Sequence, residues 1–196
     1  MTEAYDWNPM PHMVDTQCPS CDSCAVFEFA EVVRIELKKD VNFFKESPFF
    51  DYRLFQNWEG QRWHGAIFYA GLHGDGVSVI RDLPDGYSPE DWKHSKYLYR
   101  SHGMDIGSIS CSKCHLKQKH NLSWPKEAYY SVQYKDRQLW AFNRDSMIAL
   151  RDYIDSNNRN LKNFRWQSFL LHVPSEFKQK KARAHVVKQI DRLLMG

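Results

Sequence analysis

Four of the chain's five cysteines occur in two C-x-x-C pairs, a spacing that is typical of metal ligands. The first clip is Cys18–Cys21 and the second clip is Cys111–Cys114. Each clip offers two sulfur atoms to one ion, and two clips complete the tetrahedron that zinc prefers in closed structural sites. We therefore predict one zinc ion held by Cys18, Cys21, Cys111 and Cys114.

The predicted zinc is structural. A catalytic zinc site keeps one position open for water, whereas four thiolates leave none and hold distant pieces of chain together instead. Three histidines are possible replacement ligands, although a histidine is more often an ordinary surface or core residue: His12, His115 and His120. The sequence implies no small-molecule cofactor beside the zinc.

The first clip resembles the C-P-x-C-G knuckle of zinc-ribbon proteins, with Asp22 in the position of the glycine. Asp tolerates the left-handed backbone of a tight turn better than most residues do. The resemblance covers only the segments around the clips, so residues 22–110 would form a large insertion. Because residues 21–24 are also a C-x-x-C, Cys24 is a spare thiol or an alternative ligand, and Pro19 favours Cys18 and Cys21.

Other uses of the clips have weaker support. Residues 111–115 fit the C-x-x-C-H pattern of haem attachment, which takes place outside the cytoplasm. A thioredoxin-like redox role for the first clip would need a buried strand before it and a helix after it, and a polar tail precedes it instead. Unrelated buried cysteines are a further alternative, because free cysteine packs as a small apolar side chain.

The composition suits one globular domain or a domain with a large insert, with 42% hydrophobic and 26% charged residues in 196. No apolar run approaches the roughly 18 residues that a membrane span needs. Acids at Glu3, Asp6 and Asp15 stand where a signal peptide would be basic and then apolar. We expect a cytoplasmic protein without membrane contact, where reduced thiols favour metal binding over disulfides.

Charge is distributed unevenly along the chain. Residues 1–100 contain 10 Lys and Arg against 16 Asp and Glu, whereas residues 101–196 contain 17 against 8. An acidic first half is suited to a basic protein surface, and a basic second half is suited to phosphates.

Periodicity predicts the elements of the first half. Val26–Leu37 alternates as one long strand or a broken pair, and residues 38–63 are expected to be packed loop with a short helix. Gly65–Leu72 and Val77–Ile80 flank a glycine-rich link, which is typical of a hairpin. Ser88 and Pro89 are expected to start a helix.

In the second half, strands are predicted on both sides of the second clip, at residues 106–110 and 116–120. A hairpin is expected from Tyr129–Tyr134 and Gln138–Phe142, followed by a helix capped by Asn143, with Met147, Leu150 and Ile154 on one face. The polar residues 155–160 should end that helix. We expect a last strand at Phe164–Val173 and a final helix that begins at Pro174-Ser175-Glu176.

These elements predict an α+β fold: a four-cysteine zinc ribbon with a large inserted β-rich subdomain and a C-terminal hairpin plus helices. The expected segments are an N-terminal tail at 1–17, ribbon halves at 18–24 and 106–122, an acidic aromatic insert at 25–105, and a basic α/β part at 123–196.

The final helix suggests a partner. Basic groups recur along one face at steps of three and four residues, and apolar residues at 182, 186, 190 and 193 occupy another face. Such a stripe can follow a phosphate backbone, although lysine and arginine are also ordinary on solvated helices. The predicted contacts to DNA or RNA are Lys117, Lys119, Lys178, Lys181, Lys188 and Arg192. Four aromatic residues could stack on unpaired bases, or could simply belong to the core: Trp124, Tyr129, Tyr134 and Trp140.

We therefore expect a zinc-binding protein that binds nucleic acid or helps to assemble a nucleoprotein complex, without catalysing a reaction. One alternative is a protein-interaction adaptor that docks on a larger enzyme. Another follows from a similarity between residues 111–117 and the closing segment of HNH nucleases, which would assign metal-dependent cleavage to His73 and His115. The HNH motif is incomplete, because no asparagine lies between Trp58 and His120.

Overall fold

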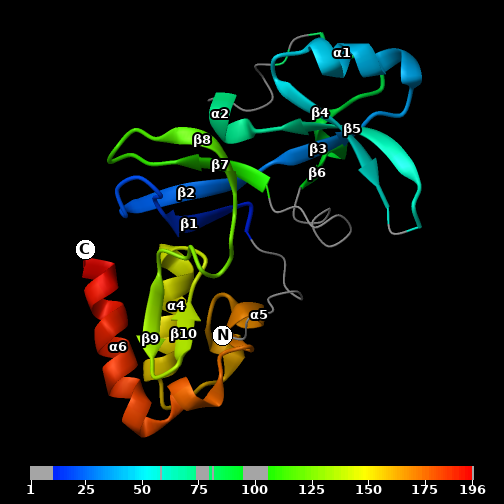
Figure 1. Cartoon of the computed structure of the whole chain (residues 1–196). Coiled ribbons are helices and arrows are strands. Elements are labelled where there is room, and N and C mark those ends of the chain that lie inside the picture. The colour runs from blue at the N-terminus through cyan, green and yellow to red at the C-terminus, as the bar shows by residue number, and fades with distance from the viewer. Residues whose placement is uncertain (1–10, 58, 74–79, 81, 95–105, 196) are drawn as a thin grey trace. The chain divides into compact units, whose positions relative to one another are not determined.

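The computed structural model describes residues 11–57, 59–73, 80, 82–94 and 106–195. The chain forms two compact units, which are described separately (Figure 1). The sheet unit comprises Cys18–Cys21 and Ala25–Ser123, and the helical unit comprises Met1–Gln17, Asp22–Cys24 and Trp124–Gly196. None of the helices in the described residues has the length and apolar character required to cross a membrane. The four segments predicted from the sequence remain a prediction.

The sheet unit contains the antiparallel strands β2 (Cys24–Phe29), β7 (Ile106–Ser110) and β8 (Lys117–Asn121), with β7 between the other two. Alternate side chains of β2 are buried, namely Ala25, Phe27 and Phe29, which is the period-2 pattern of a strand with one face in the core. The predicted strands on both sides of the second clip are confirmed as β7 and β8.

A second antiparallel sheet of the same unit has the strand order β4-β5-β3-β6. The broken strand predicted for residues 26–37 is confirmed, because β2 and β3 are separated only by Ala30, whose backbone N–H donates to Ile106 at 3.0 Å. The chain therefore passes from one sheet into the other at this residue. The strands are β3 (Glu31–Arg34), β4 (Phe50–Gln56), β5 (Arg62–Phe68) and β6 (Lys93–His94).

Three predictions in this unit are wrong in whole or in part. The expected short helix is α1 (Val41–Glu46), but the expected loop after it contains β4, whose buried residues Phe50 and Phe55 do not alternate regularly. The expected hairpin strand ends as the short helix α2 (Ala70–His73), and Val77–Val79 lie outside the described residues. Ser88 precedes a single 3-10 turn, Pro89–Asp91, rather than a helix.

The helical unit contains the predicted hairpin, formed by β9 (Ser131–Tyr134) and β10 (Arg137–Trp140). Its two-residue turn has Lys135 at a φ of 52°. The predicted helix is α4 (Arg144–Asp155), and its start is fixed by a capping box: the Asn143 side chain accepts from Ser146 N–H, and Ser146 Oγ accepts from Asn143 N–H. Strand β1 (Met13–Gln17) also belongs to this unit.

The end of the chain differs from the sequence-based prediction. The expected strand at 164–173 is instead the short helix α5 (Gln167–Leu170), which buries Phe169 and Leu170. The expected start of the final helix at residue 174 is a 3-10 turn at Ser175–Lys178, and α6 (Lys180–Met195) begins after it. The described residues thus form a mixed α and β protein with five α-helices and antiparallel sheets.

Candidate metal centre

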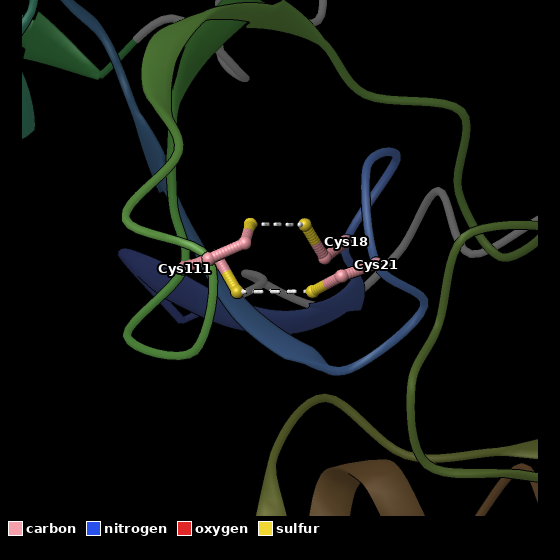
Figure 2. Close-up of side chains that lie close together, drawn as sticks. Cys18, Cys21 and Cys111 are labelled. Carbon is pink, nitrogen blue, oxygen red and sulfur yellow. Dashed lines mark hydrogen bonds between the residues drawn. The ribbon is translucent and has the colours of Figure 1, made fainter.

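The two clips bring their four sulfur atoms together. Cys18 Sγ lies 3.6 Å from Cys114 Sγ, Cys21 Sγ lies 3.7 Å from Cys111 Sγ, and all four atoms lie within 4.8 Å of one another (Figure 2). A disulfide would require about 2.05 Å, and none of the five cysteines, all within the described residues, forms one. A zinc tetrahedron with bonds of about 2.3 Å has edges of about 3.8 Å. The spacing therefore suits four ligands of one metal ion.

Strand pairing explains why cysteines 90 and 96 residues apart become neighbours. Strand β2 leads away from the first clip and β7 leads into the second clip. The two strands are antiparallel, with Val26 opposite Ser110 at the clip end and Phe29 opposite Gly107 at the other end. Both clips consequently lie at the same end of the β2–β7 pair. The segment between them, residues 22–110, therefore begins and ends beside the cysteine cluster.

Each clip is followed by a residue in the left-handed conformation. Asp22 has a φ of 58° and His115 has a φ of 60°, and each comes directly after the second cysteine of its clip. Asp22 accepts a hydrogen bond from Gln17 Nε2 at 3.1 Å, while Cys111 N–H donates to Leu116 at 2.9 Å across the second clip. The turn at Asp22 was predicted from the sequence, whereas its counterpart at His115 was not, although the position of His115 after C-x-x-C was an available indication.

The cluster is partly shielded from water. Cys18 and Cys111 are 0% and 3% exposed, whereas Cys21 and Cys114 are partly exposed. Ala25, Ile109 and Leu116 pack around the sulfur atoms. This small apolar shell lowers the local dielectric, which strengthens any interaction between thiolates and a cation.

Backbone amides also point at the sulfur atoms. Ser20 N–H lies 3.5 Å from Cys18 Sγ, and hydrogen bonds from the amides of Cys114 and then Lys113 lower the pKa of Cys111 despite its burial. The Leu116 amide acts in the same direction on Cys114, but burial and the neighbouring thiols outweigh it and raise the pKa of that thiol to about 11. The amide dipoles thus favour the charged thiolate form of the cysteines. Neighbouring thiolates repel one another, and a bound cation stabilises them by offsetting that repulsion.

The other candidate ligands lie outside this cluster. Within the described residues, the four cysteines are the sole group of three or more His, Cys, Asp or Glu side chains placed to share an ion. Cys24 heads β2, His115 is exposed in the turn, and the His120 ring packs against Phe27 with centroids 6.0 Å apart. His12 is also absent from the group. The four sulfur atoms that lie together are thus those of Cys18, Cys21, Cys111 and Cys114, without Cys24.

The residues predicted to contact nucleic acid are divided between the two units. Lys181, Lys188 and Arg192 are exposed on α6. Lys178 lies in the preceding 3-10 turn, with Nζ 6.0 Å from the centroid of the Tyr153 ring. Lys117 is exposed on β8 in the sheet unit.

Lys119, also on β8, already has partners. Its Nζ lies 2.7 Å from both carboxylate oxygens of Asp51 and 5.0 Å from the centroid of the Tyr69 ring. It would have to leave this ion pair to reach a phosphate.

The candidate stacking residue Trp140 is 1% exposed and packs edge-on against Trp124, with centroids 5.3 Å apart. The core interpretation therefore holds for Trp140. His73, named by the nuclease alternative, packs between the rings of Phe68 and Phe49. Its burial, with the nearby charges of Lys117 and Lys119, lowers its pKa.

No protein-family model, curated protein or solved structure matches this chain. The cysteine cluster is accordingly the strongest basis for a function.

Proposed function

We propose that the protein is a structural zinc protein that binds nucleic acid through its C-terminal helix. The observation that carries the zinc assignment is the pair of sulfur distances, 3.6 Å and 3.7 Å, between cysteines of different clips. Sulfur ligands in a tetrahedral set select zinc or iron, and zinc is the usual ion of two C-x-x-C clips.

The four-thiolate set supports a structural role. All tetrahedral positions are filled by protein, so neither water nor substrate has a place on the ion. Because the two clips lie beside the paired ends of β2 and β7, a bound ion would hold together the two ends of the segment between the clips, residues 22–110. Metal binding is then coupled to folding, as in other small structural zinc sites.

Thiol reactivity tests this part of the proposal. We expect four of the five thiols to be protected from an aromatic disulfide reagent in the purified protein, and to react after a strong chelator is added. A colourless protein would support zinc, and a red protein would indicate iron in the same site. If four or more thiols react at once without a chelator, the site does not hold a metal.

The nucleic-acid part rests on helix α6. Its buried side contains Ala182, Val186 and Ile190, while Lys181, Lys188 and Arg192 are exposed on the side that faces solvent. From Lys181 to Arg192 the helix rises about 16 Å, which is long enough to follow several phosphates. His185 lies between them, exposed and hydrogen-bonded to Gln189 at 2.6 Å.

The charge of this face is not cancelled by a carboxylate on the same helix. The sequence of α6 contains a single acid, Asp191, and its carboxylate pairs with Arg151 on α4 at 2.9 Å. The three exposed basic residues therefore remain available to a polyanion. Neutralising phosphates releases counterions, so affinity should fall as salt concentration rises.

A salt titration with a matched control tests the nucleic-acid part. The variant Lys181→Gln, Lys188→Gln, Arg192→Gln should lose most of its affinity for random duplex DNA or single-stranded RNA, and the wild-type logarithmic salt slope on duplex should be about −3. The control Lys38→Gln, Lys39→Gln, Lys126→Gln removes the same charge from other exposed positions and should bind normally. If wild-type protein shows no binding at low salt, this part fails and the adaptor alternative gains support.

A further inference from the structure

A cavity of about 270 Å³ lies in the helical unit between α4 and the segment 163–166. This volume lies just below the range of about 300–1,000 Å³ that is usual for ligand pockets, so the cavity has room only for a small molecule. It is separate in the chain from the cysteine cluster and from the basic face of α6. Its lining residues are Asp145, Ile148, Ala149, Asp152, Asn163, Phe164, Arg165 and Trp166.

One wall of the cavity is a continuous face of α4. Asp145, Ile148, Ala149 and Asp152 follow one another at steps of three, one and three residues, which places them on the same side of a helix. They form a stripe distinct from the buried residues Met147, Leu150 and Ile154 of the same helix. The wall thus has an apolar centre, Ile148 and Ala149, with a carboxylate at each end.

The opposite wall is held in place by an unusual backbone. Trp166 has a φ of 62° and a ψ of 35°, a left-handed conformation that is rare for a bulky residue. Its ring lies against Phe142, with centroids 6.0 Å apart, and Phe164 packs edge-on against Tyr153 at 5.3 Å. Strained residues of this kind persist where their surroundings fix them, and they are frequent at binding sites.

The charges that line the cavity are of both signs. Asp152 pairs with Arg151 at 3.2 Å, although Arg151 also pairs with Asp191 at 2.9 Å and lies 4.0 Å from Asp155, so the charge of Asp152 is only partly compensated. Asp145 and Arg165, both within the described residues, make no ion pair with each other or with another described side chain. Beside its apolar, aromatic lining the cavity therefore presents the unpaired carboxylate of Asp145 and the unpaired guanidinium of Arg165, with the partly compensated Asp152 at the other end of the α4 wall.

We propose that this cavity binds a free α-amino acid with an apolar or aromatic side chain. The ligand's ammonium group contacts Asp145, and its carboxylate contacts Arg165, which is the residue type best suited to planar, two-point recognition of a carboxylate. The Asn163 amide offers a further hydrogen bond. The ligand's side chain packs on Ile148, Ala149, Phe164 and Trp166. A zwitterion matches both free charges, whereas a simple cation or anion matches only one.

Binding by isothermal titration calorimetry tests the proposal with probes that differ only in charge. L-leucine and L-phenylalanine should bind at millimolar concentration or below. Leucine amide, which lacks the carboxylate, and N-acetyl-leucine, which lacks the ammonium, should each bind at least about tenfold more weakly, the loss expected for one charge-assisted contact. Failure of both free amino acids to bind would overturn the proposal, as would equal affinity for the amide or the N-acetyl compound.

Two variants assign the contacts. Asp145→Asn should weaken the binding of L-leucine about tenfold and leave the affinity for N-acetyl-leucine unchanged. Arg165→Gln should weaken the binding of L-leucine and leave the affinity for leucine amide unchanged. The control Asp136→Asn removes an equivalent exposed carboxylate from the hairpin turn and should bind as wild type. All three substitutions are at exposed positions, and unchanged melting temperatures would show that folding is intact. Equal L-leucine affinity in all three variants would contradict the assignment.

Discussion

The clip end of the sheet unit and the helical unit bury their apolar residues in different ways, although the second sheet of the sheet unit also buries large rings, namely Phe44, Phe50 and Phe68. Around the clips, the sheet unit has a cluster of only four buried residues, two of them cysteines: Cys18, Ala25, Ile109 and Cys111. The helical unit instead packs large rings against one another, with Trp140, Phe142, Phe169 and Phe177 all 2% exposed or less. Its longest helices also pack on each other through Arg151 and Asp191.

This difference indicates where the clip end and the helical unit each obtain their stability. Burial of large aromatic side chains in its core stabilises the folded state of the helical unit. The clip end of the sheet unit has too few apolar atoms for that, and small cores of this kind usually depend on metals or disulfides. We therefore expect the two units to respond differently to metal removal, to core mutation and to pH.

The largest expected effect is that of removing a ligand. Cys111→Ser should destabilise the clip end of the sheet unit by several kcal/mol, because structural zinc contributes roughly 10–16 kcal/mol in small zinc-dependent folds. Amide hydrogen exchange should show lost protection in β2, β7 and β8, with α4 and α6 unchanged. Cys24→Ser is the matched control and should keep wild-type protection. Equal loss of protection in both units would remove the distinction between them.

The converse experiment is a core truncation in the helical unit. Leu150 is fully buried on α4, and Leu150→Ala should reduce the free energy of unfolding by about 2–5 kcal/mol. The loss should be the same before and after chelation of the metal, as measured by urea unfolding. If the chelator changes the effect of this mutation by more than about 0.5 kcal/mol, the two units are energetically coupled.

A capping mutation should have a smaller effect in the same unit. Asn143→Ala removes the acceptor for Ser146 N–H at the start of α4 and should cost about 1 kcal/mol. Asn143→Asp, which keeps an acceptor, serves as the control and should be close to wild type. A stability unchanged in Asn143→Ala would show that the capping box does not contribute.

The turns after the clips offer a test within the sheet unit's metal site. His115→Gly should raise stability by about 0.5–1 kcal/mol, because glycine adopts the left-handed conformation without a steric penalty. Asp22→Gly should gain less, since it also loses the hydrogen bond from Gln17. His115→Val should be destabilising and should weaken metal retention in a competition assay with a chelator. A gain in stability from His115→Val would contradict the turn geometry.

The smallest expected effect is a pH dependence in the sheet unit. Burial and the charges of Lys117 and Lys119 lower the pKa of His73 in the folded state, so below about pH 6.5 the unfolded state binds the proton more readily. Protonation of His73 in the unfolded state therefore reduces the stability of the folded protein as the pH falls through the unfolded-state pKa of this residue. His73→Gln should show a shallower decline than wild type between pH 7 and pH 5.5 at constant metal. Parallel curves would exclude a contribution of His73.

The clips, strands β7 and β8, the hairpin and the capped helix α4 could be predicted because each depends on neighbouring residues. Asn143 with the apolar residues Met147, Leu150 and Ile154 marks a helix locally, and two C-x-x-C clips need no tertiary information. Strand β4 was missed because its pattern of burial, with only Phe50 and Phe55 in the core, does not alternate.

Tertiary contacts also decided the segment 164–173. Its apolar residues suit a strand, but Trp166 adopts a left-handed conformation and turns the chain into α5. The cavity beside Trp166 likewise forms only when folding brings α4 and the segment 163–166 together, and no short sequence motif predicts it. The Cys24 ambiguity needed the folded positions of the sulfur atoms, which bring Cys18 and Cys21 together with Cys111 and Cys114.

The most direct test of this account is elemental analysis of the purified, folded protein together with its cysteine variants. Wild type and Cys24→Ser should each contain one zinc per chain, and Cys111→Ser should contain none. A folded wild-type protein without stoichiometric metal, or a Cys24→Ser variant that has lost its metal, would contradict the assignment of Cys18, Cys21, Cys111 and Cys114 as the ligands.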